Sequence, residues 1–111
     1  MDGVTADDGA SGEADDVQTD IEGLIGGTGA DTITGNDGNN VIDGGAAADV
    51  IDGGAGADEL FGGDAVDTLT GGAGDDTLDG GVGTDTPLDC GDGDGDIISL
   101  GAGETALNCE L

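Results

Sequence analysis

The sequence predicts an all-β fold built from a short repeat, and three observations carry this prediction. From Gly26 to Leu88 the chain repeats every nine residues without a break. Each unit ends in a stretch of the form x-apolar-x, which is the shortest alternation that gives a strand one buried side chain. Each unit begins with glycine and other small residues, which is typical of a tight turn. Short strands and tight turns are therefore expected to alternate along most of the chain.

The chain before the repeats divides into two segments. Residues 1–16 are small, acidic and aperiodic, so we expect an acidic mobile tail. In residues 17–25 the side chains alternate as in a strand, although Val17, Ile21 and Leu24 could also line one face of a short helix. We favour the strand, as an N-terminal cap for the repeats.

Seven consecutive units occupy residues 26–88, and a degenerate eighth unit, GDGDGDIIS, follows Asp89 and Cys90 at residues 91–99. The apolar residue at the eighth position of each unit is expected to point inward. These inward residues are Ile33, Ile42, Ile51, Leu60, Leu69, Leu78 and Ile98. Pro87 takes this position in the seventh unit and cannot donate a strand hydrogen bond. Pairing is therefore expected to stop or to shift until Leu88 points inward, and the regular repeat to end at about this point.

The units follow the pattern GGxGxDxUx, and over residues 26–99 the chain resembles the RTX (repeats-in-toxin, hemolysin-type) calcium-binding nonapeptide repeat family. The resemblance implies a right-handed parallel β-roll, a β-solenoid in which two units complete one coil. About eight units would make about four coils. Strands two units apart would be neighbours in one sheet, about 4.8 Å apart. With its cap strand, the roll would extend over residues 17–99.

The roll would stack the sixth residue of each unit on that of the unit two later, along two edges. One edge carries Asp31, Asp49, Asp67 and Asp85, and the other carries Asn40, Asp58, Asp76 and Asp96. Carboxylates stacked this closely repel each other unless a cation lies between them. The resemblance implies about six calcium ions, one for each pair of units two apart, held by these side chains and by carbonyls of the glycine turns. These turn residues include Gly27, Gly29, Gly45, Gly54, Gly56, Gly63, Gly72, Gly74 and Gly81.

The two edges are not equivalent. On the first edge, Ala47 and Ala65 replace the third glycine of the turn, and a Cβ there is expected to strain the turn and weaken the middle sites. On the second edge, Asn36 replaces a glycine and Asn40 replaces the aspartate. Asparagine tolerates left-handed geometry and offers a carbonyl ligand. The first site of the second edge is therefore expected to lose a charge but to keep its shape.

Composition independently favours a bound cation. The chain has 111 residues, 27 of them Asp or Glu, with no Lys, Arg or His and a net charge of -27. Only 34% of the residues are hydrophobic and one is aromatic. So little apolar area cannot offset the entropy of ordering the chain, and we expect disorder without metal. Because calcium prefers carboxylate and carbonyl oxygens, we expect calcium to drive folding, with magnesium a poor substitute.

The same composition excludes several functions. The uncompensated negative charge excludes nucleic-acid binding. The groups usually used for acid–base and phosphate chemistry are missing and a thin roll has no concave pocket, so we expect no enzyme. No apolar run is long enough for a membrane span, and no signal peptide begins at Met1, so any export signal is expected to have been removed or to lie upstream.

Cys90 and Cys109 are the only cysteines. With no His to complete a zinc site, a disulfide is the economical interpretation, and a pair of free thiols is the alternative. The disulfide would tether residues 100–111 as a C-terminal cap. It favours an oxidising compartment, so we expect a secreted or cell-surface protein with a structural or organisational role in a surface, matrix or adhesion layer.

Two alternatives remain open. The roll could be the protomer of a calcium-stabilised filament, in which residues 17–25 of one copy pair with the edge near Leu100 of the next. It could also be an ice-binding solenoid, because threonines are expected to form a row, or rank, on the outer face of one sheet. These are Thr32, Thr34, Thr68, Thr70 and Thr86, with Val50 and Asp52 interrupting the rank. On the opposite sheet Val41 and Phe61 are expected to point outward and could mark a contact with another domain or another copy.

Overall fold

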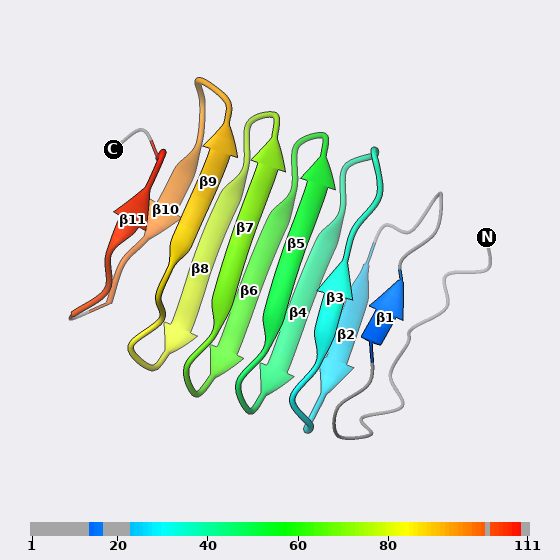
Figure 1. Cartoon of the computed structure of the whole chain (residues 1–111), viewed down its shortest axis with the longest axis vertical. Helices are drawn as coiled ribbons and strands as arrows, with labels where there is room; N and C mark the ends of the chain where they lie inside the picture. The colour runs from blue at the N-terminus through cyan, green and yellow to red at the C-terminus, as the bar shows by residue number, and fades with distance from the viewer. Residues whose placement is uncertain (1–13, 17–22, 102, 110–111) are drawn as a thin grey trace.

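The computed structural model describes residues 14–16, 23–101 and 103–109, and every regular element in these residues is a strand (Figure 1). The strands are β1 (Ala14–Asp16), β2 (Leu24–Gly27), β3 (Thr32–Thr34), β4 (Val41–Ala46), β5 (Val50–Ala55), β6 (Glu59–Asp64), β7 (Thr68–Ala73), β8 (Thr77–Val82), β9 (Leu88–Asp92), β10 (Ile97–Ser99) and β11 (Ala106–Leu107). Within the described ranges, no helix is long and apolar enough to cross a membrane.

The strands alternate between two parallel sheets. One sheet has the order β1-β3-β5-β7-β9-β11 and the other has the order β10-β8-β6-β4-β2. Figure 1 shows the chain passing from one sheet to the other at each turn, so two successive strands complete one coil. The predicted parallel β-roll is confirmed, with about five coils because β1, β2 and β11 add to the strands of the repeat units.

The nine-residue period sets both the register and the core. Ile33 pairs with Ile51, and Ile51 with Leu69, so neighbouring strands are shifted by two units. One apolar residue from each strand points between the sheets. The buried core consists of Leu24, Ile33, Ile42, Ile51, Leu60, Leu69, Leu78, Leu88 and Cys90. Of the predicted inward residues, only Ile98 is partly exposed, and it packs against this core.

The roll does not end at Pro87. Leu69 pairs with Leu88, which is fully buried, so the seventh unit contains one extra residue. The carbonyl of Pro87 accepts the N–H of Leu69 at 3.2 Å. Proline can form this bond although it has no N–H, because it acts here as the acceptor. Pairing therefore shifts, as one of the two expected outcomes, and continues into β9 and beyond.

The eighth unit begins at Cys90 and not at Gly91, which corrects the predicted boundary. Gly72 pairs with Gly91, so Cys90 takes the place of the first glycine of the unit. A second extra residue follows before β10, because Leu78 pairs with Ile98, 20 positions later. Two single insertions thus replace the two-residue spacer that we predicted from the sequence.

The two ends of the roll differ from the sequence expectations in detail. Ala14–Asp16, assigned to the end of the tail, pair as β1 with β3. The predicted cap strand at 17–25 lies partly outside the described residues, since 17–22 are not among them, and β2 begins at Leu24. At the other end β11 pairs with β9. The predicted disulfide between Cys90 and Cys109 is confirmed and joins β9 to the segment after β11.

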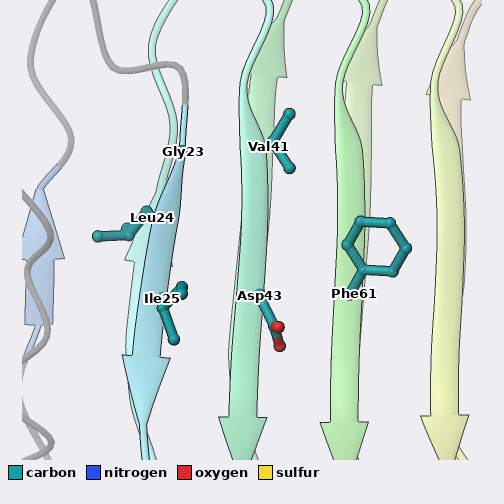
Figure 2. A pocket seen from close by; sticks show the side chains of 6 residues that line it. All are labelled: Gly23, Leu24, Ile25, Val41, Asp43 and Phe61. Atoms are coloured by element: carbon teal, nitrogen blue, oxygen red, sulfur yellow. The ribbon is translucent and has the colours of Figure 1, made fainter. Parts of the chain in front are cut away.

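The outer faces of the two sheets carry different side chains. Val41 and Phe61 point outward, as predicted, over β4 and β6, and with Ile25 they line a shallow apolar hollow that also contains Asp43 (Figure 2). On the opposite sheet Val50 and Asp52 pair between the threonines, which confirms the interruption. The last predicted threonine, Thr86, precedes β9, so the threonine rank is shorter than expected.

Candidate functional site: two ladders of stacked carboxylates

The sixth residues of the first seven units, together with Asp96 of the eighth unit, form two files along the two edges of the roll, which we call the first and second ladders. The first ladder consists of Asp31, Asp49, Asp67 and Asp85, and the second consists of Asn40, Asp58, Asp76 and Asp96. None of these side chains is more than 3% exposed. Ionisable side chains are almost never buried so completely unless they are paired or bind a metal.

Backbone hydrogen bonds connect the rungs of each ladder. In the first ladder the Oδ1 of Asp49 accepts the N–H of Asp31 at 2.8 Å, and that of Asp67 accepts the N–H of Asp49 at 2.8 Å. In the second ladder the Oδ1 of Asp58 accepts the N–H of Asn40 at 2.7 Å, and that of Asp76 accepts the N–H of Asp58 at 2.9 Å. Asp85 and Asp96 accept the N–H of Asp67 and of Asp76 in the same way. In these six rungs the carboxylate therefore uses one oxygen to hold the preceding rung.

In the same six rungs the second carboxylate oxygen, Oδ2, has no donor. These six Oδ2 atoms are buried and make no hydrogen bond, those of Asp49, Asp58, Asp67, Asp76, Asp85 and Asp96. A buried carboxylate oxygen that lacks a donor or a cation is strongly unfavourable. The chain has no Lys, Arg or His that could supply the missing charge. A cation from solution can supply this charge.

Carbonyl oxygens lie beside these unpartnered atoms. A Cβ placed on Gly44 would lie 2.5 Å from the Oδ2 of Asp49 and 2.8 Å from the carbonyl oxygen of Gly62, one coil further on. A Cβ on Gly53 would lie 2.6 Å from the Oδ2 of Asp58 and 2.7 Å from the carbonyl oxygen of Gly71. Glycine is therefore required at these two first positions, because the carboxylate of one turn and the carbonyl of the next converge there.

The hydrogen bonds of the Asn40 side chain show which oxygens surround the corresponding point in the first turn of the second ladder. Its Nδ2 donates to the carbonyl oxygens of Gly38 at 2.8 Å and Gly53 at 3.2 Å, and to the Oδ1 of Asp58 at 3.1 Å. A longer contact reaches the carbonyl oxygen of Asn36 at 3.4 Å. Carbonyls at the second and fourth positions of one unit and at the first position of the unit two later thus converge, and the repeat places their equivalents in every turn.

The predicted glycines stand at the second and fourth positions of their units. The second-position glycines Gly27, Gly45, Gly54, Gly63, Gly72 and Gly81 have φ between 91° and 114°, and the fourth-position glycines Gly56 and Gly74 have φ of 107° and 123°. Gly29 lies in the turn between β2 and β3. The sequence analysis omitted the first-position carbonyls, among them those of Gly53, Gly62 and Cys90, although the paired glycines of six units indicate that two positions are constrained.

The donor set fits calcium. Within the described part of the chain, no three Asp, Glu, Cys or His side chains gather around one point. Backbone carbonyls must therefore complete any coordination shell. Calcium takes about six to eight oxygen ligands in flexible geometry and accepts carboxylate and carbonyl oxygens together. A pair of carboxylates with several carbonyls is such a set, whereas zinc prefers the nitrogen and sulfur ligands that the ladders lack.

Burial changes the proton affinity of the ladder carboxylates. It raises the pKa of Asp49 and that of Asp76 from 3.8 to about 6, with the backbone N–H bond lowering each and the neighbouring rungs raising it. Burial also raises the pKa of Asp58 and of Asp67. Without a cation, the ladders are thus unfavourable places for negative charge.

The turns of the two ladders differ at the fourth position. Ala47 and Ala65 of the first ladder have φ of 81° and 98°, a region that L-residues with a Cβ avoid. The second ladder has Gly56 and Gly74 at the same place. The expected backbone strain is therefore present in the first ladder.

Comparison with known protein families agrees with the geometry. The family model of the RTX calcium-binding nonapeptide repeat (4 copies) matches residues 25–60 and 52–87. Searches of curated proteins and of solved structures found no significant match. The two matched segments extend over more than half of the chain and contain every rung of the ladders except Asp96. The chain therefore belongs to the RTX calcium-binding nonapeptide repeat family.

Proposed function

We propose that the chain is a structural module that folds around calcium ions bound along both ladders. The observation that supports this most directly is the file of buried carboxylate oxygens without donors, in a chain without cationic side chains. Calcium would supply positive charge and ligand bonds at these oxygens. Successive rungs would share ions, about six at most, with carbonyls of the first, second and fourth positions completing each shell.

Folding and calcium binding are coupled in this proposal. The metal-free roll must bury the ladder carboxylates without compensation, while its thin core offers little apolar burial in return. Because the ligands converge only in the folded roll, the free energy of calcium binding becomes free energy of folding. We therefore expect a disordered chain without calcium.

The proposed role is organisational, not catalytic. The ladder carboxylates are buried and engaged in holding turns together, so they are not presented to a substrate. The disulfide supports an oxidising environment, and a secreted or cell-surface location is part of the proposal. In such a place calcium at millimolar concentration would keep the module folded.

Circular dichroism with a calcium titration tests this function. In a calcium chelator we expect the spectrum of a disordered chain, and in millimolar calcium that of a β-rich protein. Magnesium at the same concentration should not substitute, because it gives up its waters reluctantly and demands octahedral geometry. The same folded spectrum in chelator and in calcium would contradict the proposal, and native mass spectrometry would count the bound ions.

A second candidate function is end-to-end assembly of rolls into a filament. Strands β2 and β10 are the outer strands of one sheet, and within the described residues nothing pairs with their outer edges. Ile25 is 51% exposed and Ile97 is 63% exposed at these two ends. Unpaired edges with exposed apolar side chains favour association. Light scattering coupled to size exclusion in calcium would show a mass that grows with protein concentration, whereas a constant monomer mass would exclude the filament.

A further inference from the structure

We infer that the first position of the second ladder, between Asn40 and Asp58, excludes calcium, and that the side-chain amide of Asn40 takes the place of the ion. The inference rests on the proposed calcium binding of the other rungs. It differs from the sequence expectation, in which Asn40 offers its carbonyl oxygen to a metal.

The amide nitrogen of Asn40 lies where the other rungs have their unpartnered oxygen. A Cβ on Gly35 would lie 2.8 Å from the Nδ2 of Asn40. In the next two units of the same ladder, a Cβ on the first glycine would lie 2.6 Å from the Oδ2 of Asp58 and 2.5 Å from the Oδ2 of Asp76. The repeat therefore places an N–H donor at a point where the following units have a metal-facing acceptor.

The contacts of this nitrogen satisfy the oxygens that would otherwise bind an ion. The Nδ2 lies 2.8 Å from the carbonyl oxygen of Gly38, 3.1 Å from the Oδ1 of Asp58 and 3.2 Å from the carbonyl oxygen of Gly53. An amide nitrogen carries two hydrogens and no lone pair for a metal. In this orientation the Oδ1 of Asn40 is buried and makes no hydrogen bond. The opposite orientation would leave three acceptors, the carbonyls of Gly38 and Gly53 and the Oδ1 of Asp58, without this donor. A cation at this point would meet the positive end of the amide dipole.

Two further asparagines fix the same turn without metal. The Oδ1 of Asn36 accepts the N–H of Gly38 at 2.7 Å. The Oδ1 of Asn39 accepts the N–H of Ala57 in the next turn of the ladder at 2.8 Å. Side-chain amides thus hold the turn itself and connect it to the following rung. This end of the second ladder should keep its shape when calcium is absent from it.

Counting bound ions in three variants tests the inference. Native mass spectrometry at saturating calcium should find one more ion in Asn40→Asp than in the wild type, because the new carboxylate opens the position. The matched control Asn39→Asp adds the same charge one residue away on an exposed side chain and should bind the wild-type number. Asn40→Ala should also bind the wild-type number, because the amide is not a ligand.

Two results of this count would overturn the inference. An unchanged number in Asn40→Asp would show that the amide is not what excludes the ion. One ion fewer in Asn40→Ala would show that the amide oxygen is a ligand. A wild-type chain that binds no calcium at all would contradict the proposed function instead.

Nuclear magnetic resonance of the calcium-saturated wild type provides a second readout that does not depend on the variants folding. The Asn40 NH₂ signals should be protected from hydrogen exchange, because both hydrogens face buried acceptors. They are assigned in the wild type itself, through correlations to the backbone resonances of Asn40. Rapid exchange of this NH₂ group in the folded wild type would overturn the inference.

Discussion

The two ladders of the roll are built on one nine-residue repeat, yet they depart from it in different places. The first ladder keeps an aspartate at every rung but has Ala47 and Ala65 at positive φ in its interior turns. The second ladder has unstrained interior turns with Gly56 and Gly74, and its changes lie at its two ends. Asn40 begins it, and the disulfide-bonded Cys90 stands in its last turn.

This difference separates two requirements of a stacked metal site. The interior of a ladder depends on the turn backbone, because carbonyls from two coils must converge without strain. The ends depend on caps, because a terminal rung has a neighbour on one side only. We expect the second ladder to hold its interior ions more tightly and to depend more on its caps.

The largest effect is expected from loss of the disulfide. A closed loop of this length, with a sequence separation of 19, stabilises the fold by about 3 kcal/mol. The carbonyl of Cys90 lies beside the Oδ2 of Asp76, since a Cβ on Gly71 would lie within 2.6 Å of both. The double variant Cys90→Ser and Cys109→Ser should therefore raise the calcium midpoint of folding, measured by circular dichroism.

The same variant shows which ladder the disulfide supports. Asp76→Ala should be non-additive with loss of the disulfide, because both changes act on one site, whereas Asp67→Ala should be additive. Equal additivity for the two would mean that the disulfide stabilises the whole roll and not the end of the second ladder. In native protein neither cysteine should react with an alkylating agent until a reductant is added.

The next largest effect is expected from removal of single rungs. Asp76→Ala should raise the calcium midpoint more than Asp67→Ala, because the site that Asp76 completes is less strained and has more binding energy to lose. Loss of one charged ligand is worth roughly 2 kcal/mol, which corresponds to more than a tenfold change in affinity. Titrations of both variants followed by circular dichroism measure this order.

An exposed aspartate gives the control for charge. Asp64 lies three residues before Asp67 and is exposed, so Asp64→Ala removes the same charge without removing a rung. It should change the midpoint little. If Asp67→Ala proves more damaging than Asp76→Ala, the alanine turns bind calcium as well as the glycine turns and the comparison of the ladders is wrong.

A smaller effect is expected from pH on the metal-free chain. The pKa values of Asp49 and Asp76, one in each ladder, are raised to about 6 in the roll from 3.8. Because the folded state binds protons more tightly at these carboxyls, they contribute stability to the metal-free roll that is fully present below pH 3.8 and is lost as the pH rises through about 6. The ladders should behave alike in this respect.

Circular dichroism in metal-depleted buffer at pH 7 and at pH 4 measures this effect. The chain should gain β-structure at the lower pH, with light scattering as the control for aggregation near its isoelectric point of about 4.1. A metal-free chain with less β-structure at pH 4 would contradict the direction derived from the pKa values.

Much of this architecture could be predicted because a strict period leaves few alternatives. With nine residues per unit and two units per coil, the inward apolar residues, the pairing of strands and the stacking of rungs follow from counting. Counting fails where residues are inserted. The extra residue at Pro87 could not be placed from the sequence, because only the structure shows that its carbonyl accepts the N–H of Leu69.

The sequence also does not distinguish roles that share one residue type. Both glycines of each pair are visible in the sequence, yet one supplies positive φ, as at Gly45, and the other supplies space, as at Gly44. Likewise the residue type of Asn40 does not show which end of its side-chain amide faces the surrounding carbonyl oxygens. That depends on which atoms of the neighbouring turns need a donor, and these are backbone carbonyls that the sequence does not show.

The smallest effect is expected from relief of strain in the first ladder. Ala47→Gly and Ala65→Gly should each lower the calcium midpoint, because glycine adopts φ near 81° and 98° without the cost of a Cβ, about 1 kcal/mol per position. Added freedom of the unfolded chain offsets part of this gain. The neighbouring change Ala48→Gly is the matched control, because Ala48 is exposed and does not have positive φ, and it should raise the midpoint slightly.

The reverse change completes this last comparison in the second ladder. Gly56→Ala introduces the same left-handed strain and also places a Cβ 2.6 Å from the carbonyl oxygen of Gly38. It should therefore cost more than Ala47→Gly gains, with both measured as calcium midpoints. If the glycine variants of the first ladder leave the midpoint unchanged, strain at the fourth position does not limit calcium binding. The ladders would then differ only at their ends, where Asn40 and Cys90 stand.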